Sequence, residues 1–175
     1  MIVAKLPIGD IDVSIIKKHH GHEGEELHEI IVSIDNNPVL IYTEGDWGSE
    51  SNILVKNEEF FRKLKEFVLT LPEIDLTIGF SDTEPLFEKM TIEILISELL
   101  TRALIYQEFN KKGEATVLFS LPEHAKGEYS TVKINNGTMD KAIEFVKGKH
   151  PNAVIWQENE LGFMNNVLRD YLASS

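Results

Sequence analysis

The chain has 175 residues, enough to bury a hydrophobic core in one domain without disulfides or structural metals. Its formal net charge of −12 disfavours direct binding to the phosphate backbone of nucleic acids, and its apolar runs are too short to span a membrane. The absence of cysteine excludes disulfides and thiolate chemistry and favours a cytoplasmic location. We therefore expect a single globular domain over residues 1–175, with neither nucleic acid nor membrane as a partner.

The first third of the sequence predicts a β-meander. Ile11, Val13 and Ile15 alternate with polar residues, as in a half-buried strand. Two β-branched runs then flank the stretch Asp-Asn-Asn-Pro at residues 35–38, which predicts a tight hairpin because asparagine tolerates the left-handed backbone conformation. The polar stretch between the first two strands, residues 19–26, is expected to form a loop.

Helical periodicity predicts two helices in the middle of the chain. Asn57 is expected to cap the first, which ends before Pro72. The second is a long apolar helix near residues 83–111, after a capping box formed by Ser81 and Glu84. Its apolar positions cover more than half of its circumference, so it should be central to the fold or form a contact between two copies of the chain. Its narrow polar stripe is expected to consist of Thr91, Glu98, Thr101, Arg102 and Glu108.

The remainder of the chain alternates strands and helices. Strands are expected in residues 114–122, 127–137 and 152–157, a helix after Thr138, and a last helix after Asn159. The fold class is therefore α+β, or mixed α/β. We expect an N-terminal β-hairpin or meander joined to a mixed sheet, with about four helices.

Four of the six histidines lie between residues 17 and 29. His20, His22 and Glu26 match the spacing H-x-H-x-x-x-E, which resembles the first metal motif of the cupins. The resemblance implies a divalent metal site, but the flanking glycines of that motif fall at Ser14 and Ser33, and the second motif is missing. A solvated loop is the competing interpretation, because two glycines and three glutamates interrupt the stretch. His28 has no partner at a ligand spacing and is expected at the surface.

Sequence motifs of several enzyme classes are missing. No serine lies in G-x-S-x-G, and no G-x-x-x-x-G-K-[ST] occurs. We therefore expect a protein that is not an enzyme and has no cofactor. A metal-binding protein or metal-dependent enzyme using residues 20–26 is the alternative.

The distribution of charge points to a protein partner. Residues 127–175 carry six acidic and five basic residues, so the acidity lies in residues 1–126. The preferred interpretation is a small interaction protein of an immunity, inhibitor or chaperone type that docks a partner with a basic face. Trp47, in a loop with two glycines, would suit an aromatic anchor. The residues expected to bind the partner are Glu23, Glu25, Glu26, Glu44, Asp46, Trp47 and Glu50.

Overall fold

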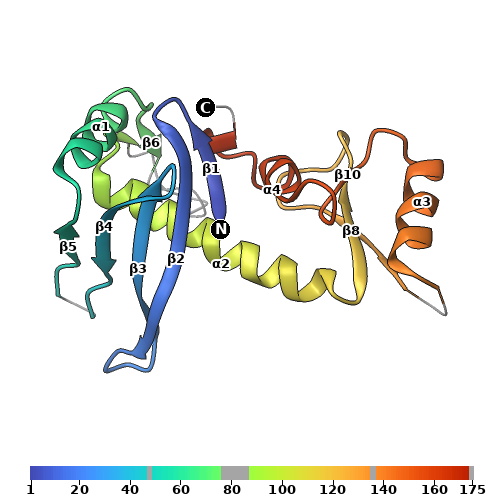
Figure 1. The fold of residues 1–175 in the computed structure, drawn as a ribbon, viewed down its shortest axis with the longest axis horizontal. Helices are drawn as coiled ribbons and strands as arrows, with labels where there is room; N and C mark the ends of the chain where they lie inside the picture. Colours follow the sequence, from blue (N-terminus) through green and yellow to red (C-terminus); the bar gives the residue numbers. More distant parts are fainter. Residues whose placement is uncertain (47–48, 76–86, 135–136, 174–175) are drawn as a thin grey trace. The chain divides into compact units, whose positions relative to one another are not determined.

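The computed structural model describes residues 1–46, 49–75, 87–134 and 137–173 (Figure 1). The chain packs into two compact units. The first consists of Met1 with Ile8–Thr101, and the second of Ile2–Pro7 with Arg102–Ser175. The single domain expected over the whole chain stays a prediction.

The first unit is built on an antiparallel meander. Its strands are neighbours in chain order: β2 (Gly9–His20), β3 (Glu26–Ile34), β4 (Asn37–Thr43) and β5 (Asn52–Val55). A short ladder of β6 (Ile74–Asp75) and β7 (Phe87–Glu88) belongs to the same unit. Ile11 and Val13 of β2 are fully buried, which confirms the predicted half-buried strand.

The hairpin predicted at residues 35–38 is confirmed. Asp35 and Asn36 connect β3 to β4 with φ angles of 49° and 64°. Two successive left-handed residues form a type I′ turn, whose twist matches that of the flanking strands. The side-chain amide of Asn37 donates to the carbonyl oxygens of Ile34 and Asp35, at 3.3 and 3.0 Å, and so closes the turn.

The loop between β2 and β3 is shorter than predicted. His19 pairs with Leu27 and His20 with Glu26, so the strands continue into the stretch expected to be loop. Leu27 is only 8% exposed, and its burial favours extension of the pairing to the end of the hairpin. Residues 21–25 alone form the loop.

Helix α1 (Glu58–Val68) begins at the predicted cap. The side chain of Asn57 accepts from the backbone amides of Glu59 and Phe60, at 3.1 and 3.2 Å. Leu64, Phe67 and Val68 are buried on one face of the helix. The helix packs against β4, as its predicted amphipathic pattern requires.

The long helix α2 (Ile92–Gly113) begins later than predicted. Thr91 acts as its cap, because its hydroxyl accepts from the amide of Ile94 at 3.3 Å. The capping box expected at Ser81 and Glu84 lies outside the described residues. In the first unit, α2 buries a broad apolar face made by Leu95, Ile96, Leu99 and Leu100.

The second unit contains a small antiparallel sheet in the order β10-β8-β9. Its strands are β8 (Thr116–Ser120), β9 (Ser130–Lys133) and β10 (Val154–Ile155). Its other elements are β1 (Ile2–Leu6), α3 (Met139–Lys149), α4 (Glu160–Leu168) and the 3-10 helix η1 (Tyr171–Ala173). Both predicted caps are confirmed, since Thr138 accepts from the amide of Lys141 and Asn159 from that of Gly162.

Strand β8 is buried on both faces because helices cover both sides of the small sheet (Figure 1). Leu118 packs with Trp156 and Phe163 on the side of α4. Phe119, one residue later, packs on the opposite side with Val146 of α3. An almost continuous apolar strand is the expected sequence for such a position.

Arg102 corrects the predicted polar stripe of the long helix. It was expected on the exposed side of the helix, but it is 1% exposed. Its Nε and Nη2 donate to the two carboxylate oxygens of Asp170, at 2.9 and 2.5 Å. Its Nη1 donates to the carbonyl oxygen of Val3 at 2.6 Å and to Oδ1 of Asn165 at 3.0 Å. An arginine can be buried here because these acceptors replace its water shell.

The predicted fold class is confirmed as α+β, with an N-terminal meander and four α-helices among the described residues. The strand pairs within each unit are antiparallel. None of the described helices combines the length and apolarity needed to cross a bilayer.

Candidate functional site

The loop of the β2–β3 hairpin is bonded to the segment that follows β4. The imidazole Nδ1 of His22 lies 2.9 Å from Oδ1 of Asp46. The backbone amide of His22 donates to the same carboxylate, 3.3 Å from Oδ1 and 3.2 Å from Oδ2. Two stretches separated by 24 residues in sequence therefore meet at the end of the hairpin.

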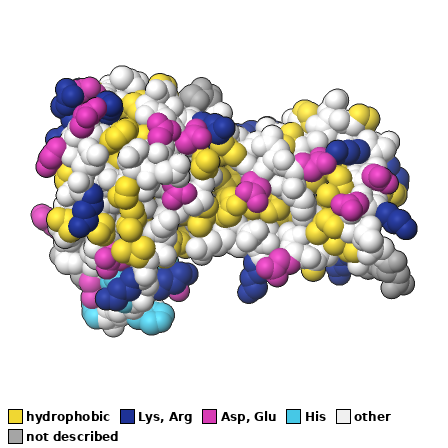
Figure 2. Space-filling model, in the orientation of Figure 1, with side chains coloured by type: hydrophobic (Ala, Val, Ile, Leu, Met, Phe, Trp, Pro, Cys, Tyr) yellow, Lys and Arg dark blue, Asp and Glu magenta, His cyan; other side chains and the backbone are white. Residues whose placement is uncertain are grey.

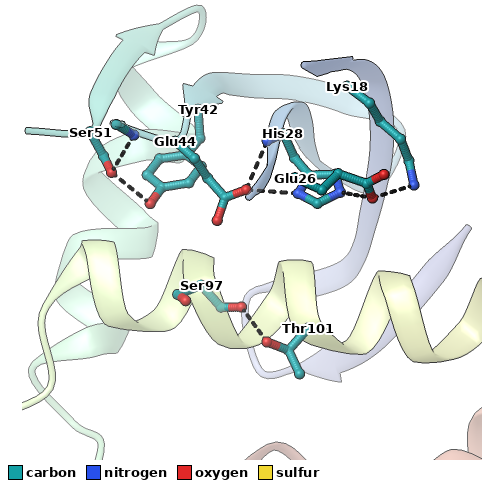
Figure 3. A network of polar contacts seen from close by, with 9 residues as sticks. Lys18, Glu26, His28, Tyr42, Glu44, Ser51, Ser97 and Thr101 are labelled. Atoms are coloured by element: carbon teal, nitrogen blue, oxygen red, sulfur yellow. Dashed lines mark hydrogen bonds and ion pairs between the residues drawn. The ribbon is translucent and has the colours of Figure 1, made fainter. Parts of the chain in front are cut away.

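A second histidine, His28 of β3, also contacts the segment that follows β4 (Figure 3). Oε2 of Glu44 lies 2.8 Å from the backbone nitrogen of His28 and 2.7 Å from its Nδ1. Nε2 of His28 lies 3.0 Å from Oε1 of Glu26, which also accepts from Nζ of Lys18 at 2.8 Å.

His28 was expected at the surface without a partner, and that prediction is wrong. The residue is 5% exposed and lies between two carboxylates. Hydrogen bonds from Lys18 and then from His28 lower the pKa of Glu26 below its usual value. The carboxylate of Glu26 thus already has two hydrogen-bonding partners within the chain, Lys18 and His28.

Ser51, at the C-terminal end of the segment between β4 and β5, forms hydrogen bonds back to residues of β4 and of this segment (Figure 3). Its hydroxyl accepts from the phenol of Tyr42 at 3.0 Å and from the amide of Gly45 at 3.2 Å. Glu50, next to it, is exposed. Trp47, the expected aromatic anchor, lies outside the described residues.

The acidic residues expected to bind a partner gather at one end of the first unit, and we call this surface the acidic tip. Figure 2 shows acidic, lysine and histidine side chains crowded there. Lys18 and two histidines lie within 4.0 Å of four of its six carboxylates. Its members are Glu23, Glu25, Glu26, Glu44, Asp46 and Glu50.

The structure does not gather the predicted metal ligands into one group. His20 pairs with Glu26 across the hairpin, and Glu26 turns to Lys18 and His28. Among the described residues, the group of three that could hold an ion is His22, Glu25 and Asp46, whose ligand atoms all lie within 4.8 Å of one another. Only His22 is common to the predicted and the observed sets.

The environment of His22 favours its protonated form. The hydrogen bond to Asp46 and then the charge of Asp46 raise the pKa of the imidazole above its usual value, and Glu25 adds to this effect. The side chain is 56% exposed, so water screens these interactions.

Comparisons with protein-family models, curated proteins and solved structures give no match to this chain.

Proposed function

We propose that this chain is a non-enzymatic binding protein that docks a partner with a basic face through the acidic tip. One observation carries the proposal: the contacts of His22 with Asp46 and of His28 with Glu44 bring the two predicted acidic stretches onto one surface. The acidic residues at 23–26 and those at 44, 46 and 50 could have faced different directions. A shared surface is what a single docking site requires.

Three carboxylates of the tip supply most of the charge that a partner would meet. Glu23 and Glu50 are exposed, and Glu25 is half-buried. Their described contacts include no lysine or arginine. The other acids contribute mainly by holding the two stretches together, since their carboxylates accept from His22, His28 or Lys18.

The roles that fit such a protein are those of an immunity protein, an inhibitor or a chaperone, in which a small acidic chain covers a basic surface. The proposal includes a cytoplasmic location, in keeping with the lack of cysteine. Self-association through α2 also stays a prediction.

The proposal is tested with two charge variants of equal net charge. In Glu23→Lys/Glu50→Lys the reversals lie on the acidic tip, and in Glu114→Lys/Glu144→Lys they lie on exposed positions of the second unit. Each double substitution changes the formal net charge from −12 to −8. We expect a partner isolated with the native chain to lose at least about tenfold in affinity for the first variant, which equals 1.4 kcal/mol, and to keep its affinity for the second.

If both variants lose affinity equally, the affinity depends on the net charge of the protein and not on charges at the acidic tip, which would contradict the proposal. Full binding by the first variant would refute the docking proposal. Circular dichroism of both variants provides the control for folding.

A further inference from the structure

The end of the hairpin brings three potential metal ligands together. His22 and Glu25 come from the loop of residues 21–25, and Asp46 follows β4. Each offers one ligand atom, and these atoms lie within 4.8 Å of one another. A single ion placed among them would be within reach of an imidazole nitrogen and two carboxylate oxygens.

Gly21 shows how closely the two carboxylates approach. A Cβ atom built on Gly21 would lie 2.4 Å from Oε1 of Glu25 and 2.7 Å from Oδ1 of Asp46. Both oxygens therefore occupy the space that a side chain at position 21 would fill. Two negative charges held this close repel each other. Nδ1 of His22 already lies 2.9 Å from Oδ1 of Asp46, so an ion bound among the three groups would replace this hydrogen bond and the proton on the imidazole.

Backbone amides orient both carboxylates before any ligand arrives. The amide of Glu23 donates to Oε2 of Glu25 at 3.1 Å, which leaves Oε1 directed toward Gly21. The amide of His22 donates to the carboxylate of Asp46. The loop itself is closed by hydrogen bonds from Gly21 to the carbonyl of Glu25, at 2.9 Å, and from Gly24 to the carbonyl of Gly21, at 3.1 Å.

We propose that His22, Glu25 and Asp46 bind one divalent transition-metal ion, with water completing its coordination. One nitrogen and two oxygen ligands suit Zn²⁺, Ni²⁺ or Mn²⁺, whereas Mg²⁺ favours sites made only of oxygen. The site differs from the spacing motif in the sequence, because His20 and Glu26 lie outside the group of three whose ligand atoms come within 4.8 Å of one another. The proposal does not depend on a protein partner.

The test is calorimetric titration of Zn²⁺ alone into tag-free protein purified without a metal-affinity step. We expect one ion per chain, and His22→Ala, Glu25→Gln and Asp46→Asn should each weaken binding by about tenfold or more. His20→Ala and Glu26→Gln, the ligands suggested by the spacing motif, are matched controls and should bind Zn²⁺ as tightly as the native chain.

Two-dimensional NMR of the same samples separates loss of a ligand from loss of folding. Added Zn²⁺ should shift the ring signals of His22 and the amides of residues 21–25 and 46, while Mg²⁺ at the same concentration should leave them in place. The proposal is overturned if Zn²⁺ does not bind, if folded His22→Ala and Asp46→Asn bind it normally, or if His20→Ala abolishes binding. Docking by the Glu23→Lys/Glu50→Lys variant is measured without metal, so the two proposals can fail separately.

Discussion

Arg102 is a buried cation whose charge is matched by one carboxylate. Its guanidinium faces Asp170 through two hydrogen bonds, and the side chain of Asp170 is itself only 14% exposed. Removing one member of such a pair leaves a charge in a poorly hydrated place, which costs more than the pair contributes when intact. The stability of the fold should therefore depend on the contact between Arg102 of α2 and Asp170.

Asp170→Ala should therefore destabilise the protein by about 3–5 kcal/mol, measured by urea denaturation. The neighbouring Arg169→Ala provides the control. Arg169 is exposed and donates only to the carbonyl oxygens of Asn166 and Pro122, so its loss should change the free energy of unfolding by less than about 0.5 kcal/mol. Equal stability of Asp170→Ala and the native chain would contradict the buried pair.

The phenol of Tyr106 donates a hydrogen bond to the carboxylate of Glu160. The pKa of Tyr106 should therefore change when this contact is removed. Burial, with the bond to Glu160 and its charge as smaller causes, raises the pKa of Tyr106 to about 12. The stability linked to this group is complete below the unfolded pKa of about 10 and is lost as the pH rises through about 12.

Glu160→Gln should lower the pKa of Tyr106 without restoring its ordinary value, because burial is the larger cause. NMR titration of the Tyr106 ring measures both values. Glu158→Gln is the control, since Glu158 pairs with Lys147. A return to the ordinary value in Glu160→Gln would show that burial has no part in the shift.

At the scale of elements, the type I′ turn between β3 and β4 places Asn36 at a φ of 64°. Glycine adopts this conformation without strain, whereas a β-branched residue is strongly disfavoured there. Asn36→Gly should leave the protein as stable as before or stabilise it by up to about 1 kcal/mol, and Asn36→Val should destabilise it by about 1–2 kcal/mol. Thermal denaturation compares the two, and equal effects would contradict the turn type.

The hairpins were predictable from the sequence, but the contacts between their ends were not. Turn chemistry at residues 35–36 sets the pairing of Ile34 with Asn37. The register shifts by one residue between Val32 and Ser33, and the shift applies to all pairs farther from the turn. As a result, His28 lies opposite Glu44 instead of Thr43. A bulge depends on local strand geometry and leaves no periodic signal, so neither the burial of His28 nor its partners could be derived from spacing.

The metal motif was misleading for a similar reason. The spacing of His20 and His22 favours a shared face only on a regular strand. The strand ends at His20, and the loop turns His22 toward Asp46, which lies 24 residues further along. Helix caps were predicted well at Asn57, Thr138 and Asn159, because capping depends on residues within one turn.

Helix α2 offers a direct comparison of a buried and an exposed position. Leu99 is fully buried, whereas Thr101 is exposed and its hydroxyl donates to the carbonyl of Ser97 (Figure 3). Leu99→Glu should unfold the first unit, because burying an unpaired carboxylate costs several kcal/mol. Thr101→Glu should change the stability by less than about 0.5 kcal/mol. Circular dichroism and urea denaturation measure both, and a stable Leu99→Glu protein would show that this face of α2 is not core.

At the scale of the whole molecule, charge is unevenly distributed along the chain. The −12 net charge comes almost entirely from residues 1–126, which include the acidic tip. A field of this sign raises the rate of encounter with a basic partner and lowers it with nucleic acid. Electrostatic steering acts mainly on association, and salt screens it over a distance of about 8 Å at physiological ionic strength.

If the acidic tip docks a basic partner, the association rate should therefore fall several-fold as salt is raised, while the dissociation rate changes little. Stopped-flow or surface-based kinetics with the isolated partner measure both rates. Glu23→Lys/Glu50→Lys should reduce the association rate at low salt and flatten its salt dependence, because it removes the charges nearest the partner. Glu114→Lys/Glu144→Lys, with the same net charge, should retain most of the dependence. An association rate indifferent to salt in the native protein would leave the acidity of residues 1–126 as a determinant of solubility alone.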